Sequence, residues 1–505
     1  MQSLYDRACQ PLPQATDIRH TSCDSAARAA PIVPPSLQGI SVSSATPFPT
    51  SVFKAYDIRG IVPDALNPAF ARALGRALAA SATAKGIDTL VVGRDGRLSS
   101  PELSVALQEG IHDGGVDTLD IGQVPTPLVY YATHVYKTGS GIAITGSHNP
   151  PKYNGFKMVM AGAALYGKDV QALRDSMIAL HEQPAVHPRG TRRELNIIDE
   201  YIDRIVGDVK LSRPMKIAID AGNGVAGAVA PALFRKLGCK VTELFTEVDG
   251  LFPNHHPDPA EPENLHDLIH CLASTDNELG LAFDGDGDRL GVVTKGGNII
   301  WPDRQLIMFA RDVLARCPGQ PIIYDVKCSR HVGLEVEAAG GQALMWQTGH
   351  SLVKAKLAET GAPLAGEMSG HIFFKERWYG FDDGLYTGAR LLEIVSREAD
   401  PSAALDALPQ ALSTPELKVE MQEGEPFNVV RALQENGEFP GVTRVVPIDG
   451  VRAEYPDGFG LARASNTTPV IVLRFEADNQ NALNRIQETF RAQLLRFAPE
   501  ARLPF

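Results

Sequence analysis

The sequence predicts an α/β fold class: three similar α/β domains with mixed, mostly parallel sheets, and a C-terminal α+β domain. The first observation is a repeat. An apolar run that ends in a polar or glycine-rich loop occurs three times, as GIAITGSHNP (141–150), GLAFDGDGDR (280–289) and APLAGEMSGH (362–371). The second observation is that each repeat begins with another short apolar run and then an Ala- and Leu-rich stretch, starting at Thr89, Met215 and Pro321. Strands that alternate with helices indicate a mostly parallel sheet covered by helices.

These repeats give the expected domain limits. They place α/β domain I at 51–193, domain II at 194–298 and domain III at 299–408. Residues 409–505 differ, because several extended segments follow one another before a final helix, which predicts a smaller α+β domain IV. The apolar side chains of that helix recur at spacings of three and four, as packing on a sheet requires: Leu483, Ile486, Phe490, Leu494 and Phe497.

The first fifty residues fall outside the repeats. They are rich in Ser, Ala, Pro and Gln, and they show no sustained periodicity. No basic stretch precedes an apolar core, so the segment does not resemble a signal peptide. We expect residues 1–50 to be a disordered extension or the product of a misassigned start, with a regulatory arm as the alternative.

Composition narrows the possible partners. The formal net charge of −12 argues against a nucleic-acid or anionic-membrane surface, so a phosphorylated ligand needs a local basic patch. The six cysteines show no metal-binding spacing and indicate reduced thiols in a cytoplasmic protein. No apolar run approaches the roughly 18 residues of a membrane span.

The first loop places a serine at the end of a predicted strand. Ser147 is followed by His148, and Lys157 lies further along the chain. Such a serine can attack phosphorus or carbon, and the lysine can reach a phosphoryl oxygen. The GxSxG pattern is absent, so nothing supports an acyl-transfer site. Taken alone, the loop is equally compatible with a cap of the following turn.

The second loop carries three alternating carboxylates. Asp284, Asp286 and Asp288 share one face of an extended segment, and they repel one another unless a cation lies between them. Oxygen ligands favour Mg²⁺ or Ca²⁺. An EF-hand is excluded, because Arg289 and Lys295 occupy the positions that need Gly and Glu. Arg289 beside a metal suits a phosphate. The alternative is a solvated acidic turn.

Two further segments suit a phosphorylated sugar. GEMSGH (366–371) combines a carboxylate, a hydroxyl and an imidazole, which is the hydrogen-bonding set that a polyol needs. RASNTTP (463–469) places a guanidinium, hydroxyls and an amide around a short turn, which suits a phosphate. A polar hairpin turn is the alternative for the second segment.

Together these motifs carry a specific resemblance. TGSHNP, DGDGDR, GEMSGH and RASNTTP, in this order, resemble the motifs of the α-D-phosphohexomutase superfamily, and KAYDIRG (54–60) and TGHS (348–351) add to the match. Within the superfamily the sequence is most similar to the bacterial phosphomannomutase/phosphoglucomutase group, over nearly all of 51–505. The resemblance implies four domains around a central cleft. It also implies an isomerase that interconverts hexose 1-phosphates and hexose 6-phosphates of mannose and glucose.

The resemblance implies roles for individual residues. Ser147 would carry the phosphoryl group and complete a Mg²⁺ site with Asp284, Asp286 and Asp288. Four other residues would act near the transferred group: Lys157, Arg59, His148 and Arg289. The substrate-binding residues would be Tyr56, Lys327, His350, Glu367, Met368, Ser369, Gly370, His371, Arg463, Ala464, Ser465, Asn466 and Thr467.

The resemblance also implies a reaction cycle. The phosphoserine gives its phosphoryl group to a hexose 1-phosphate, the resulting 1,6-bisphosphate turns end for end, and the other phosphate returns to Ser147. Glucose 1,6-bisphosphate or mannose 1,6-bisphosphate would act as activator. We expect the partners to be small-molecule phosphosugars, with no nucleic acid and no membrane, and the protein to be a monomer.

Three rival functions are weighed against this one. Phosphoglucosamine mutase shares the plan, but its loops usually read SASHNP and GEQSGH, so Gly146 and Met368 favour the hexose enzyme. A Mg²⁺-dependent phosphatase with Ser147 as nucleophile needs neither a polyol loop nor a distal phosphate cradle. A non-catalytic sugar-phosphate sensor does not need the full catalytic set.

Overall fold

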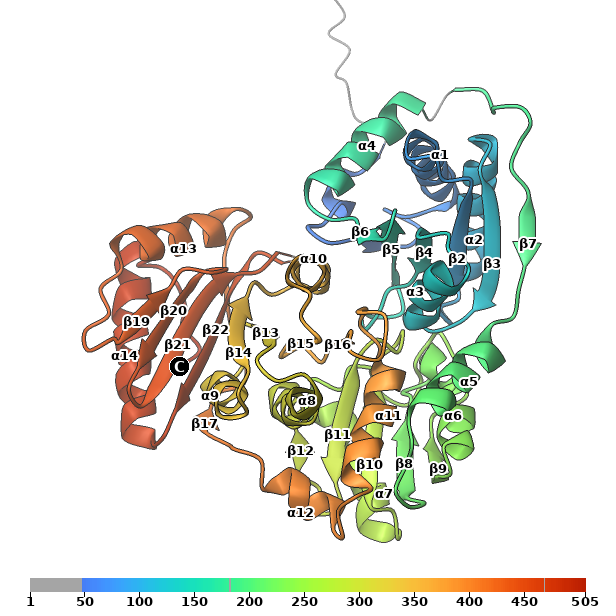
Figure 1. Ribbon diagram of the computed structural model, residues 1–505. Coiled ribbons are helices and arrows are strands. Elements are labelled where there is room, and N and C mark those ends of the chain that lie inside the picture. Colours follow the sequence, from blue (N-terminus) through green and yellow to red (C-terminus); the bar gives the residue numbers. More distant parts are fainter. Residues whose placement is uncertain (1–47, 181–182, 467) are drawn as a thin grey trace, which may run out of the picture. The chain divides into compact units, whose positions relative to one another are not determined.

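The computed structural model describes residues 48–180, 183–466 and 468–505 of the chain (Figure 1). Residues 1–47, which hold most of the expected N-terminal extension, lie outside the described residues, as does Thr467. Within the described ranges the strands form four sheets, which follow one another along the chain. No described helix is both long and apolar enough to cross a membrane.

The first sheet is built from the N-terminal part of the described chain. Its elements are η1 (Thr50–Val52), β1 (Ile58–Ile61), α1 (Pro68–Ala84), β2 (Thr89–Arg94), α2 (Ser100–Asp113), β3 (Asp117–Gln123), α3 (Thr126–Val135), β4 (Gly141–Ile144), β5 (Tyr153–Met160), β6 (Ala163–Ala164), α4 (Lys168–Leu180) and β7 (Arg192–Glu194). The strand order is β1-β5-β4-β2-β3-β7, with β6 paired to β5. The loop that carries Ser147, called the serine loop, therefore follows β4, a strand in the interior of the sheet.

The second sheet carries the acidic loop. Its segment contains α5 (Ile198–Asp208), β8 (Lys216–Asp220), η2 (Val225–Ala228), α6 (Ala230–Lys236), β9 (Lys240–Leu244), η3 (Pro262–Leu265), α7 (His266–Ser274), β10 (Leu279–Phe283), β11 (Leu290–Thr294) and β12 (Ile299–Ile300). The strand order is β12-β11-β10-β8-β9. The helix expected after β8 is split into η2 and α6. Pro231 has no backbone N–H and would break a continuous helix, but it is tolerated in the first turn of α6, where that N–H has no helical partner.

The third sheet carries the GEMSGH loop. Its segment contains α8 (Pro302–Arg316), β13 (Pro321–Asp325), α9 (Arg330–Ala338), β14 (Gln342–Trp346), α10 (His350–Thr360), β15 (Leu364–Gly366), β16 (Ile372–Phe374), α11 (Gly384–Val395) and α12 (Pro401–Asp406). The strand order is β14-β13-β15-β16.

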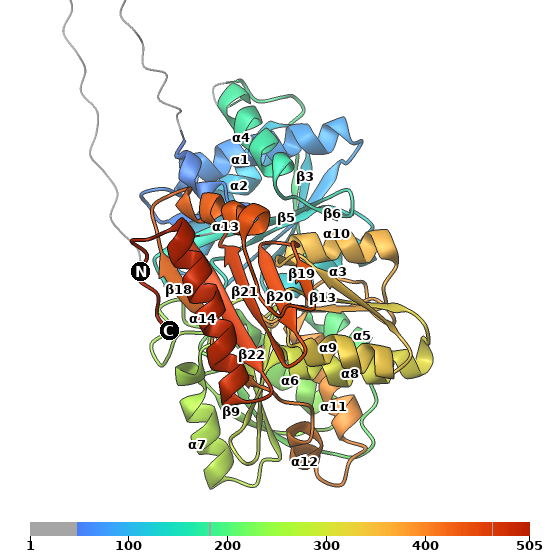
Figure 2. The same ribbon diagram turned by 90° about the vertical axis from the view of Figure 1, so that its left-hand side faces the viewer.

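The C-terminal segment is an antiparallel sheet with two helices. It contains β17 (Leu412–Ser413), β18 (Leu417–Glu420), α13 (Glu425–Asn436), β19 (Arg444–Val446), β20 (Val451–Tyr455), β21 (Gly458–Ala464), β22 (Val470–Ala477) and α14 (Gln480–Phe497). The strand order is β17-β22-β21-β20-β19, with β18 also on β22. Both helices contact this sheet, as Figure 2 also shows. The predicted apolar stripe of α14 is confirmed, since Leu483, Ile486, Phe490 and Leu494 are buried against the sheet.

One pattern recurs in the first three sheets. The strand before each functional loop, namely β4, β10 or β15, pairs in parallel with β2, β8 or β13. On its other side the same strand pairs antiparallel with the strand after the loop, namely β5, β11 or β16. This confirms the predicted repeat and the α/β fold class. The largest apolar cluster includes Tyr131, Phe234, Phe309 and Phe459, so the core is continuous from the first sheet to the fourth.

Candidate active site

The serine loop holds its nucleophile candidate in an unusual conformation. Ser147 directly follows β4 and the turn residues Thr145 and Gly146, and it is 1% exposed. Its φ of 49° lies in the left-handed region, where a residue with a side chain costs about 1–3 kcal/mol unless its surroundings hold it. The hydroxyl Oγ donates to Asp284 Oδ2 at 3.2 Å and lies 3.2 Å from His148 Nδ1. The strained backbone thus points the hydroxyl at the acidic loop.

The acidic loop approaches the serine loop closely. It is the turn between β10 and β11, and a Cβ on Gly285 would lie 2.4 Å from the carbonyl oxygen of Ser147. Only glycine permits this contact. Lys157, which β5 supplies, reaches across with its Nζ at 2.8 Å from Asp286 Oδ2 and 2.5 Å from Asp288 Oδ2.

The three carboxylates fit a divalent cation. All are fully buried, and one oxygen of each lies within 4.8 Å of the others. Asp286 Oδ1 and Asp288 Oδ1 are buried without a hydrogen-bond partner among the described residues. Burial, followed by the charges of Asp288 and Asp286, raises the pKa of Asp284 well above its usual range. A cation bound to this set of oxygens would offset the repulsion, and an all-oxygen set favours Mg²⁺ or Ca²⁺.

Lys157 is charged at this position. Burial alone would lower the pKa of its ammonium group, but the charges of Asp286 and Asp288 outweigh burial and raise that pKa above its usual value. The charged ammonium group therefore lies beside the acidic loop, paired with Asp286 and Asp288.

Arg289 connects the acidic loop to the other two loops. Its Nη2 lies 2.8 Å from His148 Nδ1, and its Nε donates to His371 Nε2 at 3.2 Å. Burial, and then the charge of Arg289, lowers the pKa of His148 well below its usual value, so His148 is a neutral imidazole. On the serine-loop side, Arg59 donates to Asn149 Oδ1 at 2.5 Å.

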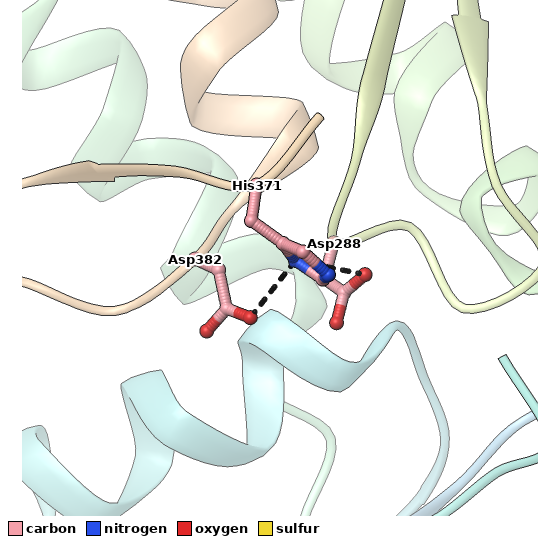
Figure 3. Close-up of side chains that lie close together, drawn as sticks. All are labelled: Asp288, His371 and Asp382. Carbon is pink, nitrogen blue, oxygen red and sulfur yellow. Dashed lines mark ion pairs between the residues drawn. The ribbon is translucent and has the colours of Figure 1, made fainter. Parts of the chain in front are cut away.

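His371 lies in a second buried cluster, with Asp288 and Asp382 (Figure 3). Its Nδ1 is 3.1 Å from Asp382 Oδ2 and 3.6 Å from Asp288 Oδ1. Because Arg289 donates to Nε2, Nδ1 of a neutral ring must carry the proton and faces the two carboxylates. A metal at Nδ1 would need the other tautomer, which would direct two N–H groups at each other. The cluster is therefore better explained as a histidine oriented by carboxylates.

The carboxylate of the GEMSGH loop is placed to accept hydrogen bonds. Glu367 is buried, and its Oε1 accepts from the backbone N–H of Gly349 at 2.5 Å. Its Oε2 has no hydrogen-bond partner in the part of the chain that the structure describes. Burial raises the pKa of Glu367 to about 7. Beside it, the His350 ring stacks on that of His371 with centroids 5.4 Å apart.

Tyr56 joins the first loop region to the last. Its hydroxyl donates to the carbonyl of Thr348 at 3.0 Å and accepts a hydrogen bond from Asn466 Nδ2. In the same turn as Asn466, the Ser465 N–H donates to the carbonyl of Val470, and the buried Ala464 ends β21. Residues predicted from the KAYDIRG, TGHS and RASNTTP motifs therefore meet.

Two basic side chains of the predicted set are held by carboxylates. Arg463 Nε donates to Asp449 Oδ2 at 2.9 Å, and Lys327 Nζ donates to Glu416 Oε1 at 2.6 Å. Both side chains are largely buried. Neither carboxylate had a sequence signal, because each lies outside the recognised motifs.

A cavity of about 490 Å³ adjoins these groups. Among the predicted residues, its wall contains His148, Arg289, Lys327, Met368 and Ser369. It also contains residues that the sequence reading missed: Asp258, Ala260, Glu261, Pro262, Trp301, Ser413, Thr414, Pro415, Glu416, Lys418 and Arg474. Gly370 is adjacent to the wall in sequence and has a φ of 103°. The cavity thus brings residues of the serine loop, the acidic loop and the GEMSGH loop to one space.

Comparison with known proteins gives the same picture. The Phosphoglucomutase/phosphomannomutase family matches the chain in four consecutive segments: alpha/beta/alpha domain I at 50–183, alpha/beta/alpha domain II at 199–297, alpha/beta/alpha domain III at 301–412, and the C-terminal domain at 416–493.

Similar proteins align with this chain over almost the whole of their own length. The chain is 56% identical to a phosphoglucomutase of Neisseria gonorrhoeae over 447 residues, which are 87% of this chain and 96% of the relative. It is 50% identical to a phosphomannomutase/phosphoglucomutase of Pseudomonas aeruginosa over 467 residues, 92% of this chain and 100% of the relative. A crystal structure of a phosphoglucomutase/phosphomannomutase family protein from Burkholderia thailandensis, 56% identical, superposes with a TM-score of 0.86 and covers 91% of this chain and 100% of that one. The chain therefore belongs to the phosphoglucomutase/phosphomannomutase family, within the α-D-phosphohexomutase superfamily.

Proposed function

We propose that this enzyme interconverts hexose 1-phosphates and hexose 6-phosphates of glucose and mannose, through a phosphoserine at Ser147 and a 1,6-bisphosphate intermediate. One observation carries the proposal. The Ser147 hydroxyl lies 3.2 Å from Asp284 Oδ2, in a site where Lys157 and Arg289 also converge. A buried serine among carboxylates and fixed cations suits phosphoryl transfer, in which catalysis is mostly positioning and charge stabilisation.

The chemistry divides into two transfers. In the first, the bond from phosphorus to Ser147 Oγ breaks and a bond to the 6-hydroxyl oxygen of a hexose 1-phosphate forms, while the hydroxyl proton passes to Ser147. In the second, the reoriented bisphosphate loses its 1-phosphoryl group to Ser147 Oγ, and the serine proton ends on the sugar O1. The products are the hexose 6-phosphate and the regenerated phosphoserine.

We propose Mg²⁺ as the cation of the acidic loop. Asp284, Asp286 and Asp288 would hold it together with an oxygen of phosphorylated Ser147, and the ion would supply charge neutralisation for the transferred group. The unpartnered oxygens of Asp286 and Asp288 support this assignment.

The chain's own cations and neutral imidazoles divide the remaining work. Lys157 and Arg59 stabilise charge near the transferred group, and Lys157 can relay a proton. Arg289 orients His148 and His371 through its two contacts. Because His148 is neutral, its Nδ1 can accept the hydrogen bond of Arg289 Nη2, and this nitrogen lies 3.2 Å from Ser147 Oγ.

Substrate contacts lie on the other loops. Glu367 and Ser369 hold sugar hydroxyls, with Met368, Gly370 and His371 in the same loop. The non-transferring phosphate binds at Arg463, Ala464, Ser465, Asn466 and Thr467, and Tyr56, Lys327 and His350 complete the site. The unpartnered Oε2 of Glu367 supports the first assignment. Both ends of the bisphosphate must use the same cradle, so hydroxyl contacts suit the ring better than a tight apolar slot.

Further expectations follow from the cycle. Glucose 1,6-bisphosphate or mannose 1,6-bisphosphate would activate the enzyme, because either one phosphorylates a serine that has lost its phosphate. We propose that the enzyme works as a cytoplasmic monomer on small phosphosugars.

An assay with both sugars tests the proposal. Glucose 1-phosphate and mannose 1-phosphate are each supplied with Mg²⁺ and a trace of glucose 1,6-bisphosphate, and the 6-phosphates are measured. We expect both to be converted without release of inorganic phosphate. Phosphate release without isomerisation would indicate the phosphatase, and a marked preference for glucosamine 6-phosphate would indicate the phosphoglucosamine mutase.

A further inference from the structure

Arg97 connects the end of β2 to the serine loop. Its side chain is 1% exposed, and its guanidinium group donates to several backbone carbonyls of that loop. The acceptors are Ser147 O at 2.6 Å, Asn149 O at 2.6 Å, Pro150 O at 2.7 Å and Tyr153 O at 3.0 Å. One side chain thus satisfies carbonyls along the whole turn from the nucleophile to the start of β5.

Asp95 completes this arrangement. Its Oδ2 accepts from Arg97 Nε at 3.1 Å and from the backbone N–H of Gly146 at 3.1 Å. Its Oδ1 accepts from Ser100 Oγ at 2.5 Å. The Asp95–Arg97 pair therefore grips the loop on both sides of the Ser147 Cα, through the N–H of the preceding residue and the carbonyl of Ser147 itself.

Gly146 leaves room for this contact in the present chain. A Cβ at position 146 would lie 2.5 Å from both Cζ and Nε of Arg97, and 2.8 Å from Tyr153 O. The φ of Gly146 is not in the left-handed region, so the constraint is steric and not conformational. Any side chain here must displace the guanidinium group or the loop.

We infer that Arg97 is the positioning residue of the nucleophile, and this inference rests on the proposed role of Ser147. Ser147 occupies a left-handed conformation that isolated serines avoid, so its surroundings must hold it. The Arg97 hydrogen bonds supply that restraint and keep Oγ directed at Asp284. Its guanidinium nitrogens are committed to backbone carbonyls and Asp95, so Arg97 acts through the loop and not on the substrate.

A purely structural role makes a different prediction. An arginine that only stabilises the fold would, when replaced, lower the melting temperature but leave the folded enzyme with normal turnover. Replacement of a positioning residue lowers kcat and the rate at which Ser147 acquires phosphate. It leaves KM nearly unchanged, because the sugar and the distal phosphate are held by the GEMSGH and RASNTTP loops.

The experiment compares Arg97→Lys, Gly146→Ala and a control in the full-length enzyme. Lysine keeps the charge but cannot reach the same carbonyls with a planar fork. Gly146→Ala keeps the arginine side chain but displaces its guanidinium group sterically. The control, Arg390→Lys, changes another fully buried arginine that pairs with Asp312 and Glu376 on the third segment.

Each protein is saturated with Mg²⁺ and given glucose 1,6-bisphosphate, and Ser147 phosphorylation is followed by intact mass, beside steady-state kinetics with glucose 1-phosphate. We expect both test variants to lose about a hundredfold in kcat and in phosphorylation rate, the cost of misplacing a reacting atom by about 1 Å. We expect KM to stay within about threefold, and Arg390→Lys to retain normal kcat.

Two results would overturn the inference: normal kcat in folded Arg97→Lys and Gly146→Ala enzymes, or a rise in KM with kcat unchanged. If Arg97→Lys does not fold, Gly146→Ala decides by the same criteria. Failure of the proposed function is a separate outcome, because the wild-type enzyme would then acquire no phosphate at Ser147.

Discussion

At the residue scale, the Ser147 side chain has several partners whose chemistry is fixed by burial. Asp284 Oδ2 accepts a hydrogen bond from the Ser147 hydroxyl, and His148 Nδ1 lies 3.2 Å from the hydroxyl oxygen. Burial raises the pKa of Asp284 and lowers the pKa of His148. Such a group of buried, mutually dependent side chains acts as a unit, so loss of one member removes most of the activity.

Ser147→Ala removes the oxygen that we propose as the acceptor of the phosphoryl group. We expect kcat to fall by about a thousandfold or more, with the melting temperature nearly unchanged, because the methyl group of alanine fits where the serine was. The measurement is steady-state conversion of glucose 1-phosphate with activator. Near-normal turnover would rule out the phosphoserine cycle.

Asp286→Asn tests the cation site. Asp286 accepts from Lys157 and from Thr126 Oγ1 at 2.6 Å, and its Oδ1 has no partner. We expect weaker Mg²⁺ binding, seen as a higher Mg²⁺ concentration for half-maximal activity, and a chelator should abolish wild-type activity reversibly. The control is Asp220→Asn, which changes a buried carboxylate that pairs with His255. Full wild-type activity in excess chelator would contradict the assignment.

Glu367 gives a prediction about pH. Burial raises its pKa to about 7, so the carboxyl is mostly neutral below that pH and ionised above it. Only the ionised form accepts hydrogen bonds with both oxygens, so KM for glucose 1-phosphate should rise roughly fivefold from about pH 7 to about pH 6. Glu367→Gln should raise KM at every pH and remove this component. An identical pH profile in the variant would show that another group titrates.

At the element scale, each functional loop connects a strand to an antiparallel partner. Register then decides which side chain returns to the site: Lys157 of β5 lies opposite Ala143 of β4, immediately before the serine loop. Arg289, which immediately precedes β11, forms an isolated antiparallel β-bridge with His371, outside the named strands. Residues on returning strands are therefore as important to the site as those in the loops.

The helix α14 stabilises the sheet that presents Arg463. Phe490 is fully buried, with its ring 5.0 Å from that of Phe439 and 5.4 Å from that of Phe475. Phe490→Ala should cost about 3–5 kcal/mol of unfolding free energy. Denaturant melts should show a large loss for this variant and a small one for Phe497→Ala, which is only partly buried. Equal losses of unfolding free energy in the two variants would mean that Phe490 does not stabilise the sheet more than Phe497 does.

Periodicity made most elements predictable, and its absence explains what was missed. The runs at Thr89, Met215 and Pro321 became β2, β8 and β13, because β-branched runs bounded by turn residues have few alternatives. The strand β20 and the helix α13 were not foreseen. Buried Arg452 interrupts the apolar character of β20, and α13 follows a glycine with no capping side chain.

The site residues likewise include some that the sequence predicted and some that it did not. Ser147 and the Asp284, Asp286 and Asp288 set were predictable, because motifs place chemically distinctive residues together in sequence. Arg97 and Asp382 were not. Arg97 acts on a loop 50 residues away through backbone carbonyls, and the carboxylate of Asp382 has meaning only beside His371 and Lys354. Such supporting residues appear only once the chain is folded.

At the scale of the whole molecule, the site is assembled from segments distant in sequence. Lys157 reaches Asp286, Arg289 reaches His371, and Tyr56 contacts both Thr348 and Asn466. Under the proposed function each loop supplies a different role, so we expect the substrate to be recognised by its phosphates and hydroxyls together.

This division of roles predicts broad specificity. Glucose and mannose differ only at the C2 hydroxyl, and we expect Glu367 and Ser369 to bind the 3- and 4-hydroxyls, which the two sugars present identically. The kcat/KM values for the two 1-phosphates should then agree within about tenfold, or roughly 1.4 kcal/mol. Glu367→Ala should impair both substrates alike. A ratio above about a thousandfold would mean that some group reads C2.

The most direct test of the central claim is a single-turnover transfer from Ser147. The enzyme is phosphorylated with glucose 1,6-bisphosphate, freed of ligand, and mixed with glucose 1-phosphate in the presence of Mg²⁺. Intact mass and peptide mapping then follow the phosphoryl group, and the bisphosphate is quantified. We predict that Ser147 loses one phosphoryl group as an equal amount of bisphosphate forms, faster than inorganic phosphate appears. Phosphate found on another residue, or released to water in place of the sugar, would contradict the account.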